Sequence, residues 1–395
     1  MLVAMVMGFS CGLPLLLTIS VLQAWMKEEG VDLAVIGMMA LVGLPYTVKF
    51  LWAPLLDRYT LPFLGRRRGW LLIAQLALAL AIAGLGFTNP ANNPWMVAFS
   101  AFLVTFFSAS QDIVVDAYRR EDLTDRELGL GSSLYINGYR TGMLLASGGG
   151  LIMADYMSFS TVYLIMALGM LPGILATLLA PEPDTPTGIP RSLKDAVLNP
   201  LVEYFSRRGA LWILAFILLY KIGDTMASAM TTPFYLDIGF TKTQIGAVVK
   251  LFGFWATIAG SLIGGICMLG LGIYRSLWVF GILQALSTAG FALLAQIGPS
   301  LSCLAGVIAF ENLSSGMGTA AYAAFMASIT NKRFTATQYA LLSSLMGVPR
   351  VLASAPTGLL AKNFGWQGFF ICCTVIALPG MILLLKIAPW KGKNK

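Results

Sequence analysis

The chain contains no histidine among its 395 residues, so it lacks the commonest metal ligand and the side chain that titrates near neutral pH. Clusters with metal-ligand spacing and the nucleotide-binding loop GxxxxGK followed by Ser or Thr are absent as well. These absences argue against an enzyme, including an intramembrane transferase, and against an ATP-driven pump. We therefore expect no enzymatic activity, no metal and no cofactor.

Charge is also scarce, since only 11% of the residues are charged while 57% are hydrophobic and the mean hydropathy is +0.79. This is the composition of a polytopic membrane protein rather than of a soluble domain. The five cysteines lie in apolar stretches, which favours buried thiols over disulfides. The net charge of +8 comes from bases in short loops between apolar runs, so we expect membrane lipid as a partner and no nucleic acid.

Apolar runs of bilayer length predict twelve membrane-spanning helices. A polar, Pro-rich stretch divides them into a six-helix bundle over 1–180, a cytoplasmic linker with an amphipathic helix over 181–210, and a second six-helix bundle over 211–395. The predicted spans are 2–26, 33–55, 70–88, 95–118, 131–154, 160–180, 211–235, 244–270, 276–297, 300–329, 337–361 and 366–388.

Basic residues in the loops predict the orientation of these spans. With both termini in the cytoplasm, 18 of the 26 Lys and Arg residues lie in cytoplasmic segments and only three lie on the opposite side. No cleavable signal peptide is expected, because the opening apolar run has no basic leader. We therefore predict a multi-pass membrane protein with cytoplasmic termini.

The two halves of the chain resemble each other. The segment from Gly131 to Arg140 corresponds to that from Leu342 to Arg350, and Asp112 corresponds to Glu311. Two six-span halves in parallel repeat resemble the layout of the major facilitator superfamily, in which the substrate binds between the halves and a monomer is the default state. The fold class expected is therefore all-α, with twelve transmembrane helices in two pseudo-repeats.

Charged side chains occur inside the predicted spans, although an unpaired charge at mid-membrane costs about 2.5–3.5 kcal/mol on insertion scales. Such residues must pair with one another or line a wet cavity, which indicates a transport path. They are Lys49, Asp112, Asp116, Arg140, Lys221, Asp224, Lys250, Glu311 and Arg350.

Asp112 and Asp116 are spaced i, i+4 and therefore share one helix face. Two carboxyls so close in a desolvated setting favour a proton on one of them. We predict that Asp112, Asp116 and Glu311 couple transport to protons. In the alternative interpretation an acid pairs with Arg140 and only holds two helices together, and Glu311 with Arg350 forms the corresponding set.

Bases slightly outnumber acids in the spans, which favours a substrate that carries carboxylates or phosphate. Aromatic residues near these charges favour stacking on sugar rings, although Lys221 and Asp224, spaced i, i+3, could also neutralise each other. The predicted substrate-binding residues are Lys49, Arg140, Lys221, Asp224, Lys250, Arg350, Tyr46, Gln111, Tyr139, Tyr220 and Trp255.

An acid and a basic cluster lie in the loop between the second and third predicted spans. This pattern resembles the cytoplasmic loop signature of the superfamily, which latches the inner side of the closed transporter, although positive-inside anchoring explains the bases equally well. The predicted gate residues are Asp57, Arg58, Arg66, Arg67 and Arg68.

Several motifs together resemble the AmpG-type anhydromuropeptide permeases over nearly the whole chain. They include the run from Lys49 to Trp70, Ser108 to Asp116, Leu219 to Asp224, Glu311 to Thr319 and Asn331 to Gln338. The resemblance implies a Gram-negative inner-membrane permease that imports N-acetylglucosaminyl-1,6-anhydro-N-acetylmuramic acid, with or without its peptide, for peptidoglycan recycling. It further implies proton-driven symport and an influence on β-lactamase induction.

A drug/proton antiporter of the same superfamily is the alternative. Such exporters carry a Gly-rich motif with a central Pro in the fifth span, whereas the run from Gly138 to Gly150 is Gly-rich without the Pro.

Overall fold

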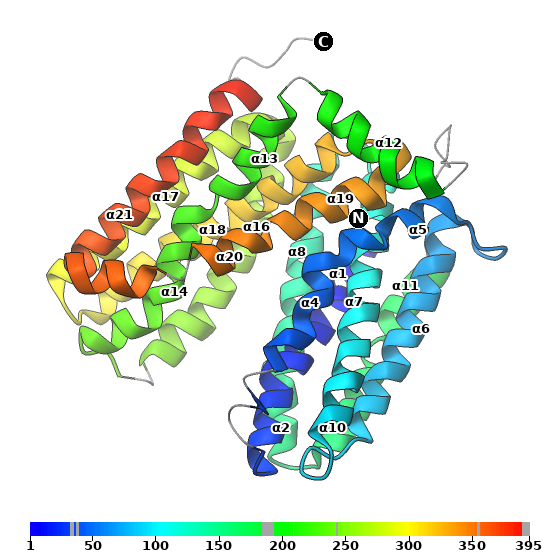
Figure 1. Cartoon of the computed structure of the whole chain (residues 1–395). Helices are drawn as coiled ribbons and strands as arrows, with labels where there is room; N and C mark the ends of the chain where they lie inside the picture. The colour runs from blue at the N-terminus through cyan, green and yellow to red at the C-terminus, as the bar shows by residue number, and fades with distance from the viewer. Residues whose placement is uncertain are drawn as a thin grey trace. The chain divides into compact units, whose positions relative to one another are not determined.

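The computed structural model describes residues 1–31, 35–36, 39–183, 193–207, 209–241, 244–353 and 356–388. These residues form helices joined by short turns, and no strand occurs within these ranges (Figure 1). The prediction of an all-α chain is therefore confirmed.

Eight helical stretches in the described part of the chain are long and apolar enough to cross a membrane. The predicted count of twelve is not confirmed, although helices also cover much of the remaining predicted spans. The eight stretches are Leu2–Glu28, Arg66–Gly86, Pro94–Asp122, Phe159–Leu179, Ala210–Thr231, Ile245–Leu271, Ile273–Ile297 and Thr357–Ile387.

Two predicted spans are divided into short helices. The run 33–55 contains the 3-10 helix η2 (Met39–Gly43), α4 (Leu44–Val48), the 3-10 helix η3 (Lys49–Leu51) and the start of α5 (Ala53–Arg58). The run 337–361 contains α19 (Thr335–Leu345) and α20 (Gly347–Leu352). Pro45, Pro54 and Pro349 lie in these pieces, and proline removes a helical hydrogen bond and clashes with the preceding turn.

The chain forms two compact units. Unit 1 comprises Met1–Thr124, Leu134–Leu201 and Thr330–Ser344, and unit 2 comprises Asp125–Ser133, Val202–Ile329 and Leu345–Lys395. Each unit therefore contains a segment from the other half of the sequence: α19 belongs to unit 1, and the start of α8 (Leu128–Leu144) belongs to unit 2. The division predicted at 181–210 remains a prediction, because residues 184–192 lie outside the described ranges.

Unit 1 is built around α1 (Leu2–Leu16), α6 (Arg66–Gly86), α7 (Pro94–Asp122) and the greater part of α8. The helices α10 (Phe159–Leu168) and α11 (Leu171–Leu179) pack against α6, as Figure 1 shows. The first helix continues through the π-helix η1 (Leu17–Val21) into α2 (Leu22–Glu28), and α8 continues through the π-helix η4 (Leu145–Gly149) into α9 (Gly150–Ala154).

Glycines bring α1 and α8 into direct backbone contact within unit 1. A Cβ added at Gly8 or Gly12 would overlap the carbonyl oxygens of Tyr135 or Tyr139, and one at Gly138 would overlap that of Met5. Small residues allow membrane helices to approach this closely. The Gly-rich sequence of α8 therefore has a packing role in this structure.

Unit 2 contains α13 (Ala210–Leu219), α14 (Ile222–Asp237), the π-helix η5 (Ile245–Phe252) and α16 (Gly253–Leu271). It continues with α17 (Ile273–Ile297), α18 (Leu301–Ile329), α20 and α21 (Thr357–Ile387). The helix α18 packs against both α16 and α17, while α21 packs against α13, α14 and α17.

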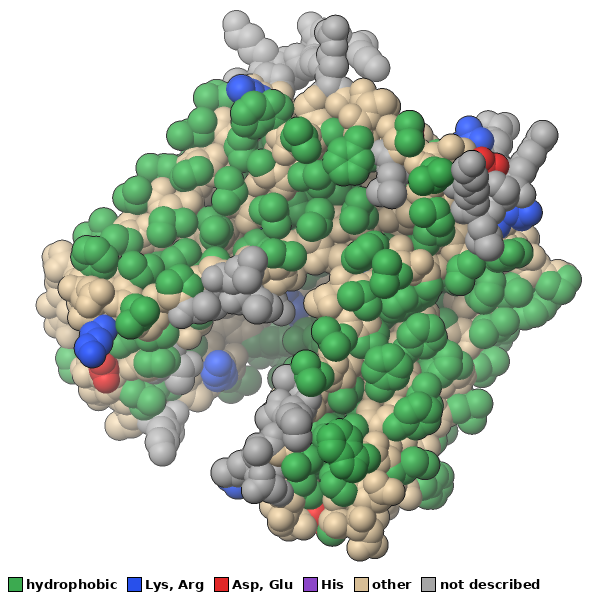
Figure 2. All heavy atoms as spheres, in the orientation of Figure 1, with side chains coloured by type: hydrophobic (Ala, Val, Ile, Leu, Met, Phe, Trp, Pro, Cys, Tyr) green, Lys and Arg blue, Asp and Glu red, His purple; other side chains and the backbone are tan. Residues whose placement is uncertain are grey.

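The helix α12 (Leu193–Ser206) lies within the segment predicted as a linker, and Val197, Leu198, Val202 and Phe205 are exposed on it. Large apolar side chains are also exposed along the long helices, among them Leu80 on α6 and Leu175 on α11. Figure 2 shows that hydrophobic side chains cover most of the visible face while few charged ones appear on it. Exposed apolar surface on this scale is typical of helices that cross a membrane.

Candidate functional site

Unit 1 buries a cluster of charged residues that we call the α7 cluster: Lys49, Asp112, Asp116 and Arg119. Asp112 and Asp116 lie one turn apart on α7, and both are buried. Lys49 on η3 is 6% exposed and lies within electrostatic range of both carboxyls. The short helices around Lys49 thus place a buried ammonium group within electrostatic range of two acids in an apolar bundle.

Arg119 is the partner of Asp116. Its guanidinium lies 3.1 Å from Asp116 Oδ1, donates a hydrogen bond of 2.8 Å to the hydroxyl of Tyr339, and lies 4.4 Å from the ring centroid of Tyr135. Three groups therefore stabilise this cation. Arg119 lies one residue beyond the predicted span 95–118, because helix ends are hard to locate from sequence, although its i, i+3 spacing from Asp116 was a usable signal.

Asp112 is less completely satisfied than Asp116. The thiol of Cys11 lies within hydrogen-bonding range of its carboxyl, whereas Asp112 Oδ1 has no hydrogen-bond partner among the described residues. Gln111, one residue earlier, donates to Cys11 Sγ at 3.2 Å and accepts from Ser10 Oγ at 3.4 Å. Asp112 is thus the acid of this cluster with spare capacity to bind a ligand or a proton.

Polar side chains from α4 and the start of α5 also face α7. The hydroxyl of Tyr46 donates to Ser108 Oγ at 2.8 Å, and Trp52 Nε1 donates to Ser110 Oγ at 3.0 Å. Tyr46, a predicted substrate-binding residue, and Trp52 are therefore held against the helix that carries the α7 cluster.

Unit 2 contains a second cluster, the α14 cluster, made of Lys221, Asp224 and Glu311. Lys221 Nζ lies 3.4 Å from Asp224 Oδ2 and donates a hydrogen bond of 2.7 Å to Thr319 Oγ1. The i, i+3 spacing therefore produces an ion pair, and both side chains remain 19% exposed. The pair lies where the chain leaves α13 and enters α14, because Lys221 has a non-helical conformation with φ −107°.

Glu311 on α18 extends this cluster from a second helix. Its Oε2 accepts a hydrogen bond of 2.5 Å from Ser287 Oγ on α17, and its carboxyl lies within hydrogen-bonding range of Asp224. Sequence reasoning matched Glu311 with Arg350 instead. The side chain of Arg350 lies outside the described residues, so that pairing stays a prediction.

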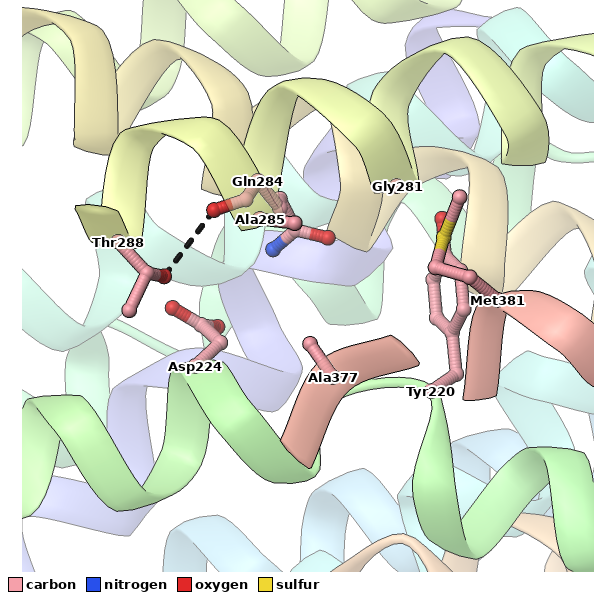
Figure 3. Close-up of a pocket in the computed structure, with 8 residues that line it drawn as sticks. All are labelled: Tyr220, Asp224, Gly281, Gln284, Ala285, Thr288, Ala377 and Met381. Carbon is pink, nitrogen blue, oxygen red and sulfur yellow. Dashed lines mark hydrogen bonds between the residues drawn. The ribbon is translucent and has the colours of Figure 1, made fainter. Parts of the chain in front are cut away.

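A small cavity borders the α14 cluster (Figure 3). Its volume of about 10 Å³ leaves room for about one water molecule, which is too little for a sugar. It is lined by Tyr220, Asp224, Gly281, Gln284, Ala285, Thr288, Ala377 and Met381. The hydroxyl of Tyr220 donates to the carbonyl of Leu277 at 2.9 Å, so this ring is fixed in the helix packing.

The remaining predicted substrate residues lie in varied environments. Tyr139 and Arg140 are half-buried on α8, Lys250 is exposed on η5, and Trp255 on α16 is 60% exposed. The structure therefore brings Lys49 to the acids of unit 1, and Lys221 with Asp224 to Glu311 in unit 2.

A third cluster, the loop cluster, consists of Asp57, Arg66, Arg67 and Glu121. Asp57 Oδ1 lies 3.1 Å from Arg66 and 2.8 Å from Arg67, and Arg67 Nε donates to Glu121 Oε2 at 2.9 Å. All four side chains are almost completely buried. Glu121, near the end of α7, was missed by sequence reasoning because nothing along the sequence relates it to Arg66 and Arg67.

The carboxyl of Asp57 also binds the beginning of α19. Asp57 Oδ2 accepts from the amide and from the hydroxyl of Thr337, each at 2.8 Å, and Oδ1 accepts from the amide of Ala336 at 3.3 Å. A carboxylate at a helix N-terminus is stabilised by free amides and by the helix dipole. Burial alone would raise the pKa of Asp57, but Arg67, Arg66 and the Thr337 amide outweigh it and hold the pKa below its usual value.

Arg58 and Arg68 make other contacts. Arg58 lies over the ring of Tyr59 at 5.3 Å, and Arg68 donates to the carbonyl oxygens of Thr177 and Leu178 at the end of α11. The carboxylate of Glu182 caps α6 by accepting from the amides of Arg67 and Arg68 at 2.7 and 3.0 Å. Arg68 thus joins α6 to α11 in this structure, whereas Arg66 and Arg67 hold Asp57.

Comparison with known proteins adds independent information. A family model for the Major Facilitator Superfamily matches residues 1–354. The Anhydromuropeptide permease of Escherichia coli K12 is 46% identical over 386 residues, which cover 97% of this chain and 78% of that protein.

Two solved structures share the fold at low sequence identity. The human organic anion transporter MFSD10 (TETRAN) has a TM-score of 0.70 at 14% identity, with 97% of each chain covered. The proton:xylose symporter XylE bound to 6-bromo-6-deoxy-D-glucose has a TM-score of 0.70 at 12% identity, with 98% of this chain and 95% of that one covered.

Proposed function

Because the chain belongs to the major facilitator superfamily and, within it, to the anhydromuropeptide permeases, we propose that it carries anhydromuropeptides across the inner membrane for peptidoglycan recycling. The observation that carries this proposal is the 46% identity to the Escherichia coli permease over 97% of the chain. The relatives are permeases and transporters, so the chain is a transporter and not an enzyme, as predicted.

The proposed substrate is N-acetylglucosaminyl-1,6-anhydro-N-acetylmuramic acid with or without its peptide. Its carboxylates require cations, and Lys49 and Lys221 lie at breaks between helices, Lys49 buried and Lys221 partly buried. Arg140, Lys250 and Arg350 complete the proposed set of cations. Tyr46, Gln111, Tyr139, Tyr220 and Trp255 are proposed to contact the sugar rings and amides, and Asp224 to take part in binding.

Proton coupling is proposed at Asp112, Asp116 and Glu311. Support comes from the α7 cluster, where Asp112 lies near both Lys49 and Asp116 and has an oxygen without a hydrogen-bond partner among the described residues. A proton on Asp112 removes its attraction for Lys49, which then becomes available for a substrate carboxylate. Asp116 forms a direct ion pair with Arg119 at 3.1 Å, and a proton on Asp116 would release that arginine.

The loop cluster is proposed as the latch on the cytoplasmic side. Its support is that Asp57 joins the loop before α6 to the N-terminus of α19, which comes from the other half of the sequence. Opening the transport path toward the cytoplasm requires the hydrogen bonds between Asp57 and α19 to break. Their number stabilises the closed state. Arg58 and Arg68 are proposed to contribute positive charge next to the latch.

The proposed setting is the inner membrane of a Gram-negative bacterium, with both termini in the cytoplasm and a monomer as the working unit. The apolar helix surfaces support contact with membrane lipid, and the distribution of Lys and Arg in the loops supports the orientation. The proposed mechanism is proton-driven symport, and the proposed direction of transport is into the cell.

Uptake of labelled anhydromuropeptide tests the proposal. Right-side-out and inverted vesicles containing the chain are given an imposed pH gradient, and vesicles without the chain serve as the control. We expect accumulation that depends on the gradient, and Asp112→Asn should abolish this accumulation while exchange is partly retained. Uptake that ignores the gradient would contradict proton coupling, and export of dyes in place of uptake would favour the drug antiporter.

A further inference from the structure

Two carboxyl groups from different helices approach each other in unit 2. Asp224 lies in the first turn of α14 and Glu311 lies within α18, and their side chains are within hydrogen-bonding range. An ionised carboxylate can only accept hydrogen bonds. A hydrogen bond between these two groups therefore requires one proton on the pair.

The surrounding charges also indicate that the pair of Asp224 and Glu311 carries one proton. Among the described residues, the ionisable groups that face the pair are Lys221, 3.4 Å from Asp224, and Tyr235 on α14, which lies near Glu311. Lys221 balances one carboxylate, so a second ionised carboxylate would leave a net negative charge among apolar helices. Because Lys221 holds Asp224 directly, the proton belongs on Glu311, whose Oε2 accepts a hydrogen bond from Ser287.

A neighbouring amide has unused hydrogen-bonding capacity. Gln284 on α17 is 6% exposed, and its Nε2 has no hydrogen-bond partner among the described residues. Figure 3 shows its amide and the carboxyl of Asp224 directed into the same cavity, which has room for about one water molecule. Gly318 leaves space for this amide, because a Cβ there would overlap Gln284 Oε1.

We propose that Asp224 and Glu311 together form a proton-binding site in unit 2, with Gln284 as the hydrogen-bond donor that reaches Asp224 through a water molecule in the cavity. In the loaded state Glu311 carries the proton and donates it in a hydrogen bond to the ionised Asp224. Release of the proton breaks that bond, and the two carboxylates then repel each other, which separates α14 from α18. This inference rests on the proposed symport function and assigns Asp224 to the proton rather than to the substrate.

Infrared spectroscopy of the purified full-length chain tests the shared proton without any substrate. Difference spectra between the wild type and each variant are recorded as a function of pH in the band of protonated carboxyl groups. Both Glu311→Gln and Asp224→Asn should remove the same single titrating band, since Lys221 then pairs with the one remaining acid. The exposed Asp155→Asn serves as the matched control and should leave this band unchanged.

Transport gives the second readout. If one proton moves with each substrate, a gradient of one pH unit supports about tenfold accumulation. We expect Glu311→Gln to lose this accumulation while exchange at equal pH is retained, and Glu311→Asp to recover part of the gradient dependence. If Glu311→Gln does not reach the membrane in folded form, Asp224→Asn provides the same test.

The outcomes separate this inference from the proposed function. Two independent carboxyl bands, each removed by one variant only, would overturn the shared proton, as would full gradient-driven accumulation in Glu311→Gln. Accumulation driven by a sodium gradient and lost in both variants would overturn it in favour of a cation site. Failure of the wild type to transport anhydromuropeptide would reject the proposed function, while the infrared titration would still decide the proton site.

Discussion

The carboxylate of Asp57 binds both the backbone amide and the side-chain hydroxyl of Thr337, each at 2.8 Å, across 280 residues of sequence. Arg66 and Arg67 hold the same carboxylate from its own side of the sequence. One buried acid thus connects two basic residues at the start of α6 with the start of α19.

Replacing Asp57 should therefore weaken unit 1. Removing one partner of a buried ion pair costs about 3–5 kcal/mol, because the remaining charges stay buried. We expect Asp57→Ala to lower the melting temperature in detergent, and Asp57→Asn to lower it less, since the amide oxygen can still accept from Thr337. Asp155→Asn is the exposed control, and equal melting temperatures for all three variants would contradict the latch.

The stabilisation of the folded chain by Asp57 should also depend on pH, in a direction that follows from its lowered pKa. Its pKa in the folded chain is below the usual value, so its stabilisation is fully present above the unfolded pKa of about 3.9 and is lost as pH falls through the lower folded pKa. We expect the difference in melting temperature between the wild type and Asp57→Asn to be constant from neutral pH to about pH 5. It should shrink in more acidic buffer, and a difference that grows there would reverse the inferred sign.

Local spacing predicted those parts of the clusters that lie on one helix. The i, i+4 relation placed Asp112 and Asp116 together, and the i, i+3 relation predicted the pair of Lys221 with Asp224, because helical geometry alone decides these contacts. The all-α fold and most long apolar helices also followed from composition and run length.

Contacts between helices could not be predicted in the same way. The bond from Asp57 to Thr337, the meeting of Glu311 with Asp224, and the position of Lys49 beside α7 depend on how separate helices pack. The division of 33–55 into short helices was missed for a different reason: hydropathy averages over prolines, although each proline interrupts the backbone hydrogen bonds locally.

Arg119 should be required for both stability and transport. Alanine at this position leaves Asp116 buried without its ion-pair partner and removes the contacts with Tyr135 and Tyr339, at a cost of about 3–5 kcal/mol. Lysine keeps the charge but not the planar group, so Arg119→Lys should lie between alanine and the wild type.

A double variant tests whether the unpaired charge of Asp116 explains the stability that Arg119→Ala loses. In Arg119→Ala combined with Asp116→Asn the uncompensated carboxylate is gone, so we expect the melting temperature to recover part of the loss. If the double variant melts as low as the sum of both single effects predicts, the two residues do not interact.

The contact between α1 and α8 gives a prediction that is independent of charge. A Cβ at Gly138 would overlap the carbonyl oxygen of Met5. Gly138→Ala must therefore push α1 and α8 apart, which loosens the packing between them and lowers stability. Gly84 on α6 has nothing within 4 Å of the corresponding Cβ position and serves as the matched control. Alanine there should stabilise the helix by about 0.5–1 kcal/mol, because glycine loses more conformational freedom on folding. Melting curves in detergent should therefore move in opposite directions for the two substitutions, and a neutral Gly138→Ala would mean that α1 and α8 do not approach at this position.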